Sequence, residues 1–118
     1  MSTVAQISQE LKGTTYVIHM IGEIDVSNLP ELEGTVNPLA SDTSANSFIL
    51  DCNGLEFIDS KVVGYMAYLY STLSRSQKKL MIVGANSTIS DILTLVGLNS
   101  IIPIFPTTEE ALKSLNQT

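Results

Sequence analysis

Short apolar runs rich in β-branched residues alternate along this chain with segments whose apolar residues recur at helical spacing. The runs occupy residues 16–21, 48–51, 80–83 and 101–105, and their nearly continuous apolar character predicts strands covered on both faces. An earlier segment, 4–8, is expected to pair with 16–21 through a turn at Lys12-Gly13, because glycine supplies the positive φ of such turns. The alternation predicts an α/β fold with a mostly parallel sheet of four to five strands.

About four helices are expected between and after these strands. The first carries an apolar stripe that includes Leu32 and Val36; it begins after Ser27 or Asn28 as N-cap and ends near Val36, because Pro38 follows. The second runs from Ser60, its predicted cap, to about residue 77, and its core-facing stripe comprises Val62, Met66, Leu69 and Leu73.

The last two helices are predicted from cap residues. One begins at Ser87 and stops at Gly97, a common C-terminal glycine signal. The other begins at Thr107, which with Glu110 has the spacing of a capping box. No repeat, linker or low-complexity tract divides the sequence, so one domain over residues 1–118 is predicted.

Composition narrows the functional classes. A length of 118 residues suits one domain, and the single cysteine, Cys52, excludes an internal disulfide and a multi-cysteine zinc site. Six basic residues, scattered along the sequence, against twelve acidic ones give a net charge of −6, which argues against nucleic acid or an anionic membrane as partner. No apolar run approaches the roughly 20 residues of a membrane span, and residues 1–11 lack a signal-peptide pattern. A cytoplasmic protein is expected.

No catalytic set, metal site or cofactor site is evident. His19, the only histidine, lies within a strand and is interpreted as structural, and Cys52 is interpreted as an inert packed thiol. A phosphotransfer enzyme that uses Asp51 or Asp59 as nucleophile is an alternative. It is disfavoured because 101–105, the last predicted strand, carries no lysine like that of receiver domains. The protein is therefore predicted not to be an enzyme.

The segment 48–70 carries the candidate site, because a strand and a short loop lead there into Asp59-Ser60 and a helix. Ser60 is either only an N-cap, contributing about 1 kcal/mol, or a functional residue. Asp25 is expected at the same edge as Asp59, since both follow strands. Tyr65 and Tyr68 lie off the apolar stripe, so they are either exposed interface anchors or residues that flank the core.

Several motifs together resemble the STAS domain family, in particular the bacterial anti-sigma factor antagonists. The motifs are Gly22-Glu23-Ile24-Asp25, Leu55-Glu56-Phe57-Ile58-Asp59-Ser60, Leu80-Met81-Ile82-Val83-Gly84 and Leu93-Thr94-Leu95-Val96-Gly97-Leu98. The resemblance implies a single STAS domain that takes part in partner switching. A serine kinase, often itself the anti-sigma factor, would phosphorylate Ser60, and a serine phosphatase would reverse the reaction. The unphosphorylated form would bind the kinase and so release a sigma factor.

The chain departs from the family pattern directly after the serine. Lys61 and Val62 stand where the family usually has Ser or Thr and then Gly, and only Gly64 matches. Lys61 is able to pair with a phosphate, and Val62 is expected to add bulk at the docking surface. These departures favour an alternative, a non-phosphorylated STAS scaffold subunit of a lipid-transport or stress-signalling complex. The predicted partner-binding residues are Asp25, Asp59, Ser60, Lys61, Gly64, Tyr65 and Tyr68.

Overall fold

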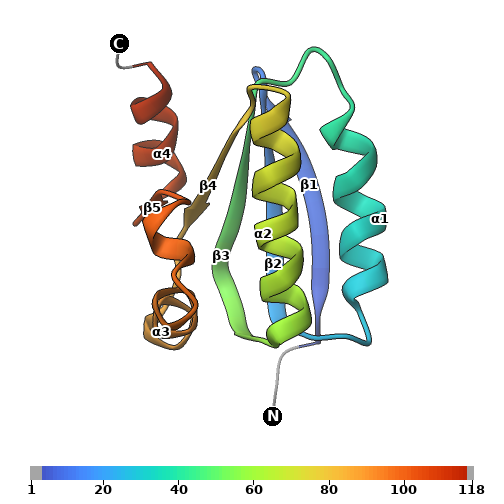
Figure 1. Cartoon of the computed structure of the whole chain (residues 1–118), viewed down its shortest axis with the longest axis vertical. Coiled ribbons are helices and arrows are strands. Elements are labelled where there is room, and N and C mark those ends of the chain that lie inside the picture. Colours follow the sequence, from blue (N-terminus) through green and yellow to red (C-terminus); the bar gives the residue numbers. More distant parts are fainter. Residues whose placement is uncertain (1–3, 117–118) are drawn as a thin grey trace.

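A computed structural model describes residues 4–116 and contains a five-stranded sheet in the order β1-β2-β3-β4-β5. β1 is antiparallel to β2 and every other pair is parallel, which confirms the predicted α/β fold (Figure 1). The strands are β1 (Gln6–Lys12), β2 (Thr15–Ile24), β3 (Ser47–Ile58), β4 (Lys79–Val83) and β5 (Ile104–Phe105). The helices are α1 (Leu29–Ala40), α2 (Ser60–Arg75), α3 (Ser87–Leu95) and α4 (Thr108–Leu115), with a 3-10 turn, η1 (Leu98–Ser100).

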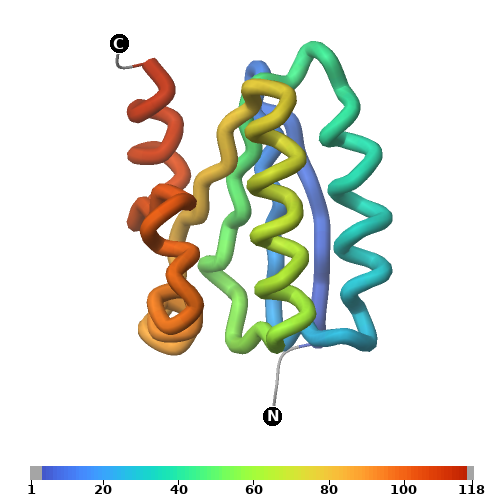
Figure 2. The backbone as a smooth tube through the Cα atoms, viewed as in Figure 1, coloured from blue at the N-terminus to red at the C-terminus, as the bar shows by residue number. Residues whose placement is uncertain are grey.

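Helices cover the two faces of the sheet unequally. α1, α2 and α3 pack on one face and form the large apolar cluster, whereas α4 packs through Ala111 on the other face, against Val17, Ile49 and Met81. α1 and α2 run side by side along the sheet, as the backbone trace shows (Figure 2). The face that carries α4 is open over β1 and the adjoining part of β2, because α4 packs toward β3, β4 and β5.

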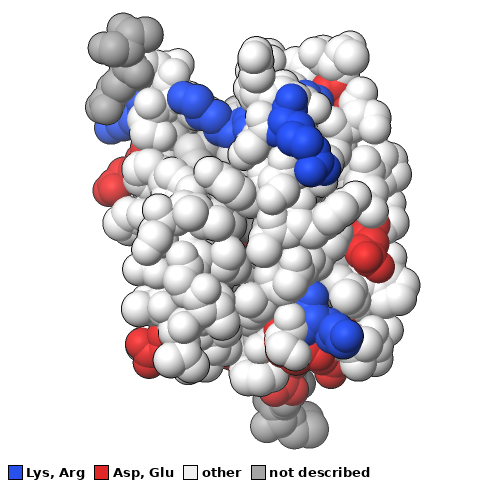
Figure 3. All heavy atoms as spheres, viewed as in Figure 1, with Lys and Arg blue, Asp and Glu red and all other residues white. Residues whose placement is uncertain are grey.

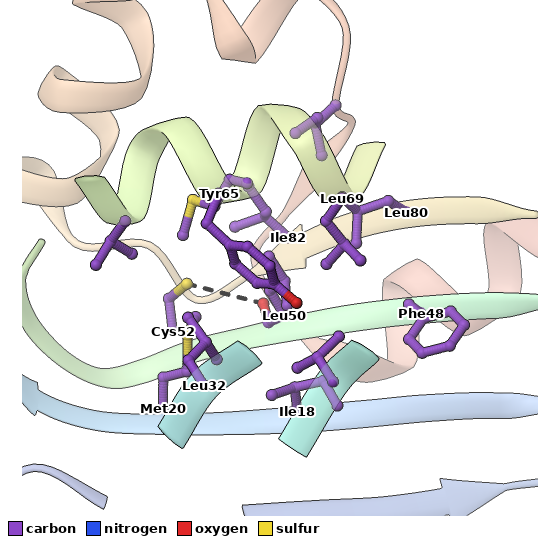
Figure 4. Packing of buried hydrophobic residues seen from close by; sticks show 14 of the residues in the cluster. Ile18, Met20, Leu32, Phe48, Leu50, Cys52, Tyr65, Leu69, Leu80 and Ile82 are labelled. Atoms are coloured by element: carbon purple, nitrogen blue, oxygen red, sulfur yellow. Dashed lines mark hydrogen bonds between the residues drawn. The ribbon is translucent and has the colours of Figure 1, made fainter. Parts of the chain in front are cut away.

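The large cluster forms because the predicted stripe of α2 meets the inward residues of the strands (Figure 4). Val62, Met66, Leu69 and Leu73 are all fully buried, as their spacing predicted. Each such side chain contributes roughly 1.5–3 kcal/mol relative to leaving it exposed. Cys52 lies in the same cluster, and burial raises the pKa of its thiol to about 12, so it is the inert packed residue expected from the sequence.

Two predicted boundaries were wrong. α1 continues past Val36 to Ala40 with Pro38 inside it, because a proline in the last turn removes only one backbone hydrogen bond. β3 does not stop at Asp51 but continues to Ile58, and irregular pairing with β2 accommodates the extra length. Gly54 permits this pairing, since a Cβ there would lie 2.9 Å from Cγ1 of Ile21.

Other predicted boundaries differ from the observed ones by a few residues. β1 is 6–12 rather than 4–8, although its turn does use Gly13 at φ +63°. α3 is capped by Asn86 rather than Ser87, because the Asn86 side chain accepts the Ile89 N–H at 2.9 Å. Thr107 caps α4 as predicted, and β5 is only two residues long. No helix in residues 4–116 combines the length and apolar character needed to cross a membrane.

His19 joins three strands on the face opposite the large cluster. Its Nδ1 lies 2.6 Å from Oδ2 of Asp51 on β3, and its Nε2 lies 2.8 Å from Oε1 of Glu10 on β1. Partial burial alone would lower the pKa of His19, but the hydrogen bonds to Glu10 and Asp51 outweigh it and raise that pKa. His19 therefore has a structural role as a link between three strands, and its two carboxylate partners favour the protonated ring.

We predict that His19→Gln lowers the free energy of unfolding by up to about 1 kcal/mol near pH 5.5 and by less near pH 9. Because the pKa of His19 is higher in the folded than in the unfolded protein, protonation of His19 stabilises the fold. This stabilisation is complete below the unfolded-state pKa of about 6.5, and it is lost as the pH rises through the folded-state pKa. Urea denaturation at both pH values measures the difference. Glu109→Gln, at an exposed acid on α4, is the control, and an equal loss for His19→Gln at both pH values would contradict the prediction.

Candidate functional site

The start of α2 is organised by Asp59 rather than by Ser60. Asp59 occupies the N-cap with extended backbone, and its Oδ1 accepts the Val62 N–H at 3.0 Å. The prediction that Ser60 is the cap was wrong, because the carboxylate one residue earlier already reaches the third N–H of the helix. Ser60 is the first residue of α2.

Ser60 is exposed and chemically accessible. Within the described part of the chain its hydroxyl makes no hydrogen bond, so no contact would have to be broken to modify it. The first N–H groups of a helix lack intrahelical partners, and the helix dipole is positive there. The start of α2 would therefore favour a phosphate on Ser60, whereas the carboxylate of the adjacent Asp59 would oppose it.

Asp25 and Asp59 lie at the same end of the parallel strands, directly after β2 and β3. Ile24 and Ile58 are register partners in β2 and β3, so the two aspartates follow paired residues. Oδ2 of Asp59 accepts the Val26 N–H at 2.9 Å, which ties the β2–α1 loop to the start of α2. One carboxylate thus holds together the two segments that flank Ser60.

Asp25 is itself held in the β2–α1 loop. Hydrogen bonds from the hydroxyl and then the backbone N–H of Ser27 lower the pKa of the Asp25 carboxyl. The Asn28 side chain accepts the Asp25 N–H at 2.8 Å instead of capping α1, although Asn28 occupies the N-cap position. Asp25 is therefore an ionised, ordered neighbour of the start of α2.

A groove of about 310 Å³ lies between α1 and α2. One side of the groove is formed by α2, through four of the residues that the sequence predicted to bind a partner. The other side is formed by α1, through three residues spaced four apart in the sequence. The lining residues are Lys61, Gly64, Tyr65 and Tyr68 from α2, and Leu29, Glu33 and Asn37 from α1. The groove begins one residue after Ser60, so the serine and the groove form one continuous surface.

Tyr65 and Tyr68 differ in exposure. Tyr68 is 54% exposed, whereas Tyr65 is only 6% exposed, so of the two interpretations left open by the sequence the exposed anchor fits only Tyr68. The Tyr65 ring packs among the core residues drawn in Figure 4, and its hydroxyl donates to Oδ1 of Asn37 at 2.6 Å. The two rings are stacked with centroids 6.1 Å apart, so buried Tyr65 supports exposed Tyr68.

The two departures from the family pattern have different structural consequences. Val62 is fully buried, so its bulk fills the core and adds nothing to the docking surface, contrary to expectation. Lys61 is exposed and lines the groove together with Glu33. Only Lys61 therefore alters the surface next to Ser60.

Sequence reasoning missed several residues of this surface. Val26 is 59% exposed and Phe57 is 42% exposed, and both belong to the segments that lead into the site. The α1 wall, Leu29, Glu33 and Asn37, has an i, i+4, i+8 spacing that marks one helix face. That spacing was visible in the sequence, but nothing local indicated which element the face would meet.

The family model, the sequence relatives and the solved structures that resemble this chain agree with one another. A family model described as the STAS domain matches residues 6–111. The anti-sigma-F factor antagonist RsfA of Mycobacterium tuberculosis is 28% identical over 115 residues, which cover 92% of this chain and 90% of RsfA. An anti-sigma factor antagonist from Mycobacterium paratuberculosis, solved by crystallography, superposes with a TM-score of 0.88 at 23% identity over 99% of this chain and 100% of that chain. The Bacillus cell fate determinant SpoIIAA in its phosphorylated form superposes with a TM-score of 0.76 at 20% identity over 93% and 99% of the two chains.

Removing the Asp59 carboxylate should destabilise the protein more than removing the Ser60 hydroxyl. Asp59→Ala loses the helix cap and the bond to Val26, at a cost of about 1–2 kcal/mol. Ser60→Ala should change the free energy of unfolding by less than about 0.5 kcal/mol. Urea denaturation of both variants measures this, and a loss of about 1 kcal/mol in Ser60→Ala would restore the serine as the cap.

Proposed function

Because this chain belongs to the STAS domain family, we propose that it is an anti-sigma factor antagonist controlled by phosphorylation of Ser60. In this proposal the unphosphorylated protein binds an anti-sigma factor that is also a serine kinase, and a serine phosphatase resets it. The observation that carries the proposal is the free, exposed hydroxyl of Ser60 at the head of the groove between α1 and α2. The similarity to RsfA, an anti-sigma-F factor antagonist, supports the choice of partner.

Phosphorylation at Ser60 would act on the surface rather than on the fold. The start of α2 offers backbone N–H groups and a positive dipole end to a phosphate. The carboxylates of Asp25 and Asp59 lie beside it, and a phosphoserine adds about −1.5 to −2 charge. The modified surface would therefore repel acidic groups on a partner while the domain stays folded. SpoIIAA, a protein of the same fold, has been solved in a phosphorylated form.

Gly64 supports the groove as the docking surface. A Cβ at Gly64 would meet nothing within 4 Å, so the packing of this chain does not require glycine there. Glycine inside a helix costs about 0.5–1 kcal/mol relative to alanine. Close approach of a partner to the helix at this position would account for a residue that the domain itself does not need.

Tyr68 supplies an anchor beside Gly64. It is half exposed, it is already ordered by stacking on Tyr65, and aromatic residues of this kind often dominate interface energies. A partner that covers Tyr68 would lose little side-chain entropy from this protein, because the ring is held in place before binding.

The unphosphorylated scaffold remains the second candidate, and Lys61 is the observation that favours it. Lys61 is exposed directly after Ser60 and would offset part of the charge of a phosphate. A scaffold would bind its complex regardless of the charge at position 60, whereas an antagonist would not.

Phosphotransfer by the protein itself is disfavoured by the surroundings of Asp51. Both of its oxygens are engaged, one by His19 and the other by the backbone and side chain of Asn53. No cluster of three or more His, Cys, Asp or Glu side chains suited to a metal ion occurs among residues 4–116. The contacts of Asp51 argue against its use as the nucleophile.

Incubation with ATP and an anti-sigma factor that is a serine kinase should place one phosphate on Ser60, identified by mass spectrometry. Ser60→Ala should abolish labelling. Ser60→Asp should weaken binding to the kinase about 100-fold, which corresponds to roughly 3 kcal/mol at 1.4 kcal/mol per decade. Binding that is insensitive to Ser60→Asp, with no phosphate on Ser60, would instead favour the scaffold.

Gly64→Ala should stabilise the protein by up to about 1 kcal/mol and weaken partner binding at least tenfold. Gly34→Ala is a matched control, because Gly34 is also an exposed helical glycine with open space around its Cβ position and does not line the groove. Calorimetric titration with the partner and urea denaturation give the two quantities. Equal affinities for both variants would reject the groove as the docking surface.

A further inference from the structure

A second cavity lies at the opposite end of the sheet from Ser60. It has a volume of about 620 Å³ and is formed between the starting ends of the parallel strands and α4. Cavities of roughly 300–1,000 Å³ are typical of small-molecule sites. Neither the proposed partner switch nor any residue discussed for it involves this cavity.

One row of side chains crosses four strands along this cavity. Lys12 of β1 pairs with Thr15 of β2, which pairs with Ser47 of β3, which pairs with Lys79 of β4. Side chains of directly opposed residues lie on the same face of a sheet. The register therefore places two hydroxyls between two lysines, and all four residues line the cavity.

The hydroxyls of Thr15 and Ser47 form a buried hydrogen bond of 2.7 Å with each other. Each hydroxyl carries one proton, and the bond uses only one of the two. Within the described residues neither side chain makes a second hydrogen bond. One hydroxyl proton therefore remains available to donate to an acceptor in the cavity.

The lysines supply positive charge to the cavity. The ion pairs found in residues 4–116 all involve His19, so neither Lys12 nor Lys79 is paired with a carboxylate there. Basic residues that are scattered along the sequence gather at this end, where β1 and α2 finish and β4 starts, and Figure 3 shows most of the visible Lys and Arg atoms there. In a chain of net charge −6, this end attracts anions.

The apolar part of the cavity lining comes from α4. Leu112 and Leu115 line the cavity, together with Asn116 at the end of that helix. A ligand that fills the cavity must therefore present an anionic group to the lysines and hydroxyls and an aliphatic body to the leucines. Neither inorganic phosphate nor a neutral lipid meets both requirements.

We propose that this cavity binds a small organic anion with an aliphatic body, either a carboxylate or a phosphate monoester. Lys12 and Lys79 neutralise the anionic group, the Thr15–Ser47 pair donates a hydrogen bond to it, and Leu112 and Leu115 cover the aliphatic body. The site is independent of Ser60 and stands whether or not Ser60 is phosphorylated.

To test the proposal, octanoate and hexyl phosphate are each titrated into the full chain, and binding is measured by calorimetry and by changes in amide NMR shifts. Saturable binding of at least one of them, with shifts centred on Thr15, Ser47 and Leu112, is expected, and their relative affinities distinguish the carboxylate from the phosphate source. Octanamide, which lacks the charge, and inorganic phosphate, which lacks the aliphatic body, should each bind at least tenfold more weakly than the better probe.

Variants of the lysines make the test specific. Lys12→Gln and Lys79→Gln should each weaken binding of the better probe at least tenfold, while Lys113→Gln, on α4 but outside the cavity lining, should leave it unchanged. Urea denaturation checks that each variant is folded. Absence of saturable binding by both anions, equal binding of octanamide, or undiminished binding in both lysine variants would overturn the proposal.

Discussion

The parallel pairing of β2 with β3 determines where the two proposed sites of this protein lie. These two long strands occupy the middle of the sheet, and their inward residues form the floor of the main core. Their register places Asp25 beside Asp59 at one end and Thr15 beside Ser47 at the other. Shifting one strand by a single residue would turn its apolar residues from core to solvent, so this register is strongly specified by burial.

At the Ser60 end of the sheet, the adjacent residues Asp59 and Ser60 have different roles. Asp59 caps α2 and accepts a hydrogen bond from the β2–α1 loop, so neither contact requires the Ser60 hydroxyl. A serine that capped the helix could be modified only by breaking its own contact. Because the carboxylate does the capping, the hydroxyl is free, and the negative charge near it is already present before any phosphate is added.

Much of this arrangement was predictable from local patterns. The apolar runs and helical stripes predicted the α/β fold and the buried face of α2, and the order of Asp59 and Ser60 predicted their place at the start of that helix. Some errors were local, since the predicted caps of α2 and α3 each lay one residue from the observed ones. Others fell where a prediction needed a partner from elsewhere in the chain. The exposure of Tyr65 was left open because its contact, Asn37, lies on another helix, and β3 was cut short because its length depends on irregular pairing with β2.

The sequence by itself determined the fold class, the strand and helix segments and the position of Ser60, because periodicity and capping act over only a few residues. Tertiary structure alone decided which carboxylate bonds which loop, that Lys61, Gly64 and Tyr68 share a groove with α1, and that Lys12 and Lys79 line one cavity. The physical reason is the separation in sequence of the residues concerned. Such contacts exist only once sheet register and helix packing bring distant segments together, and neither is written in any short stretch of residues.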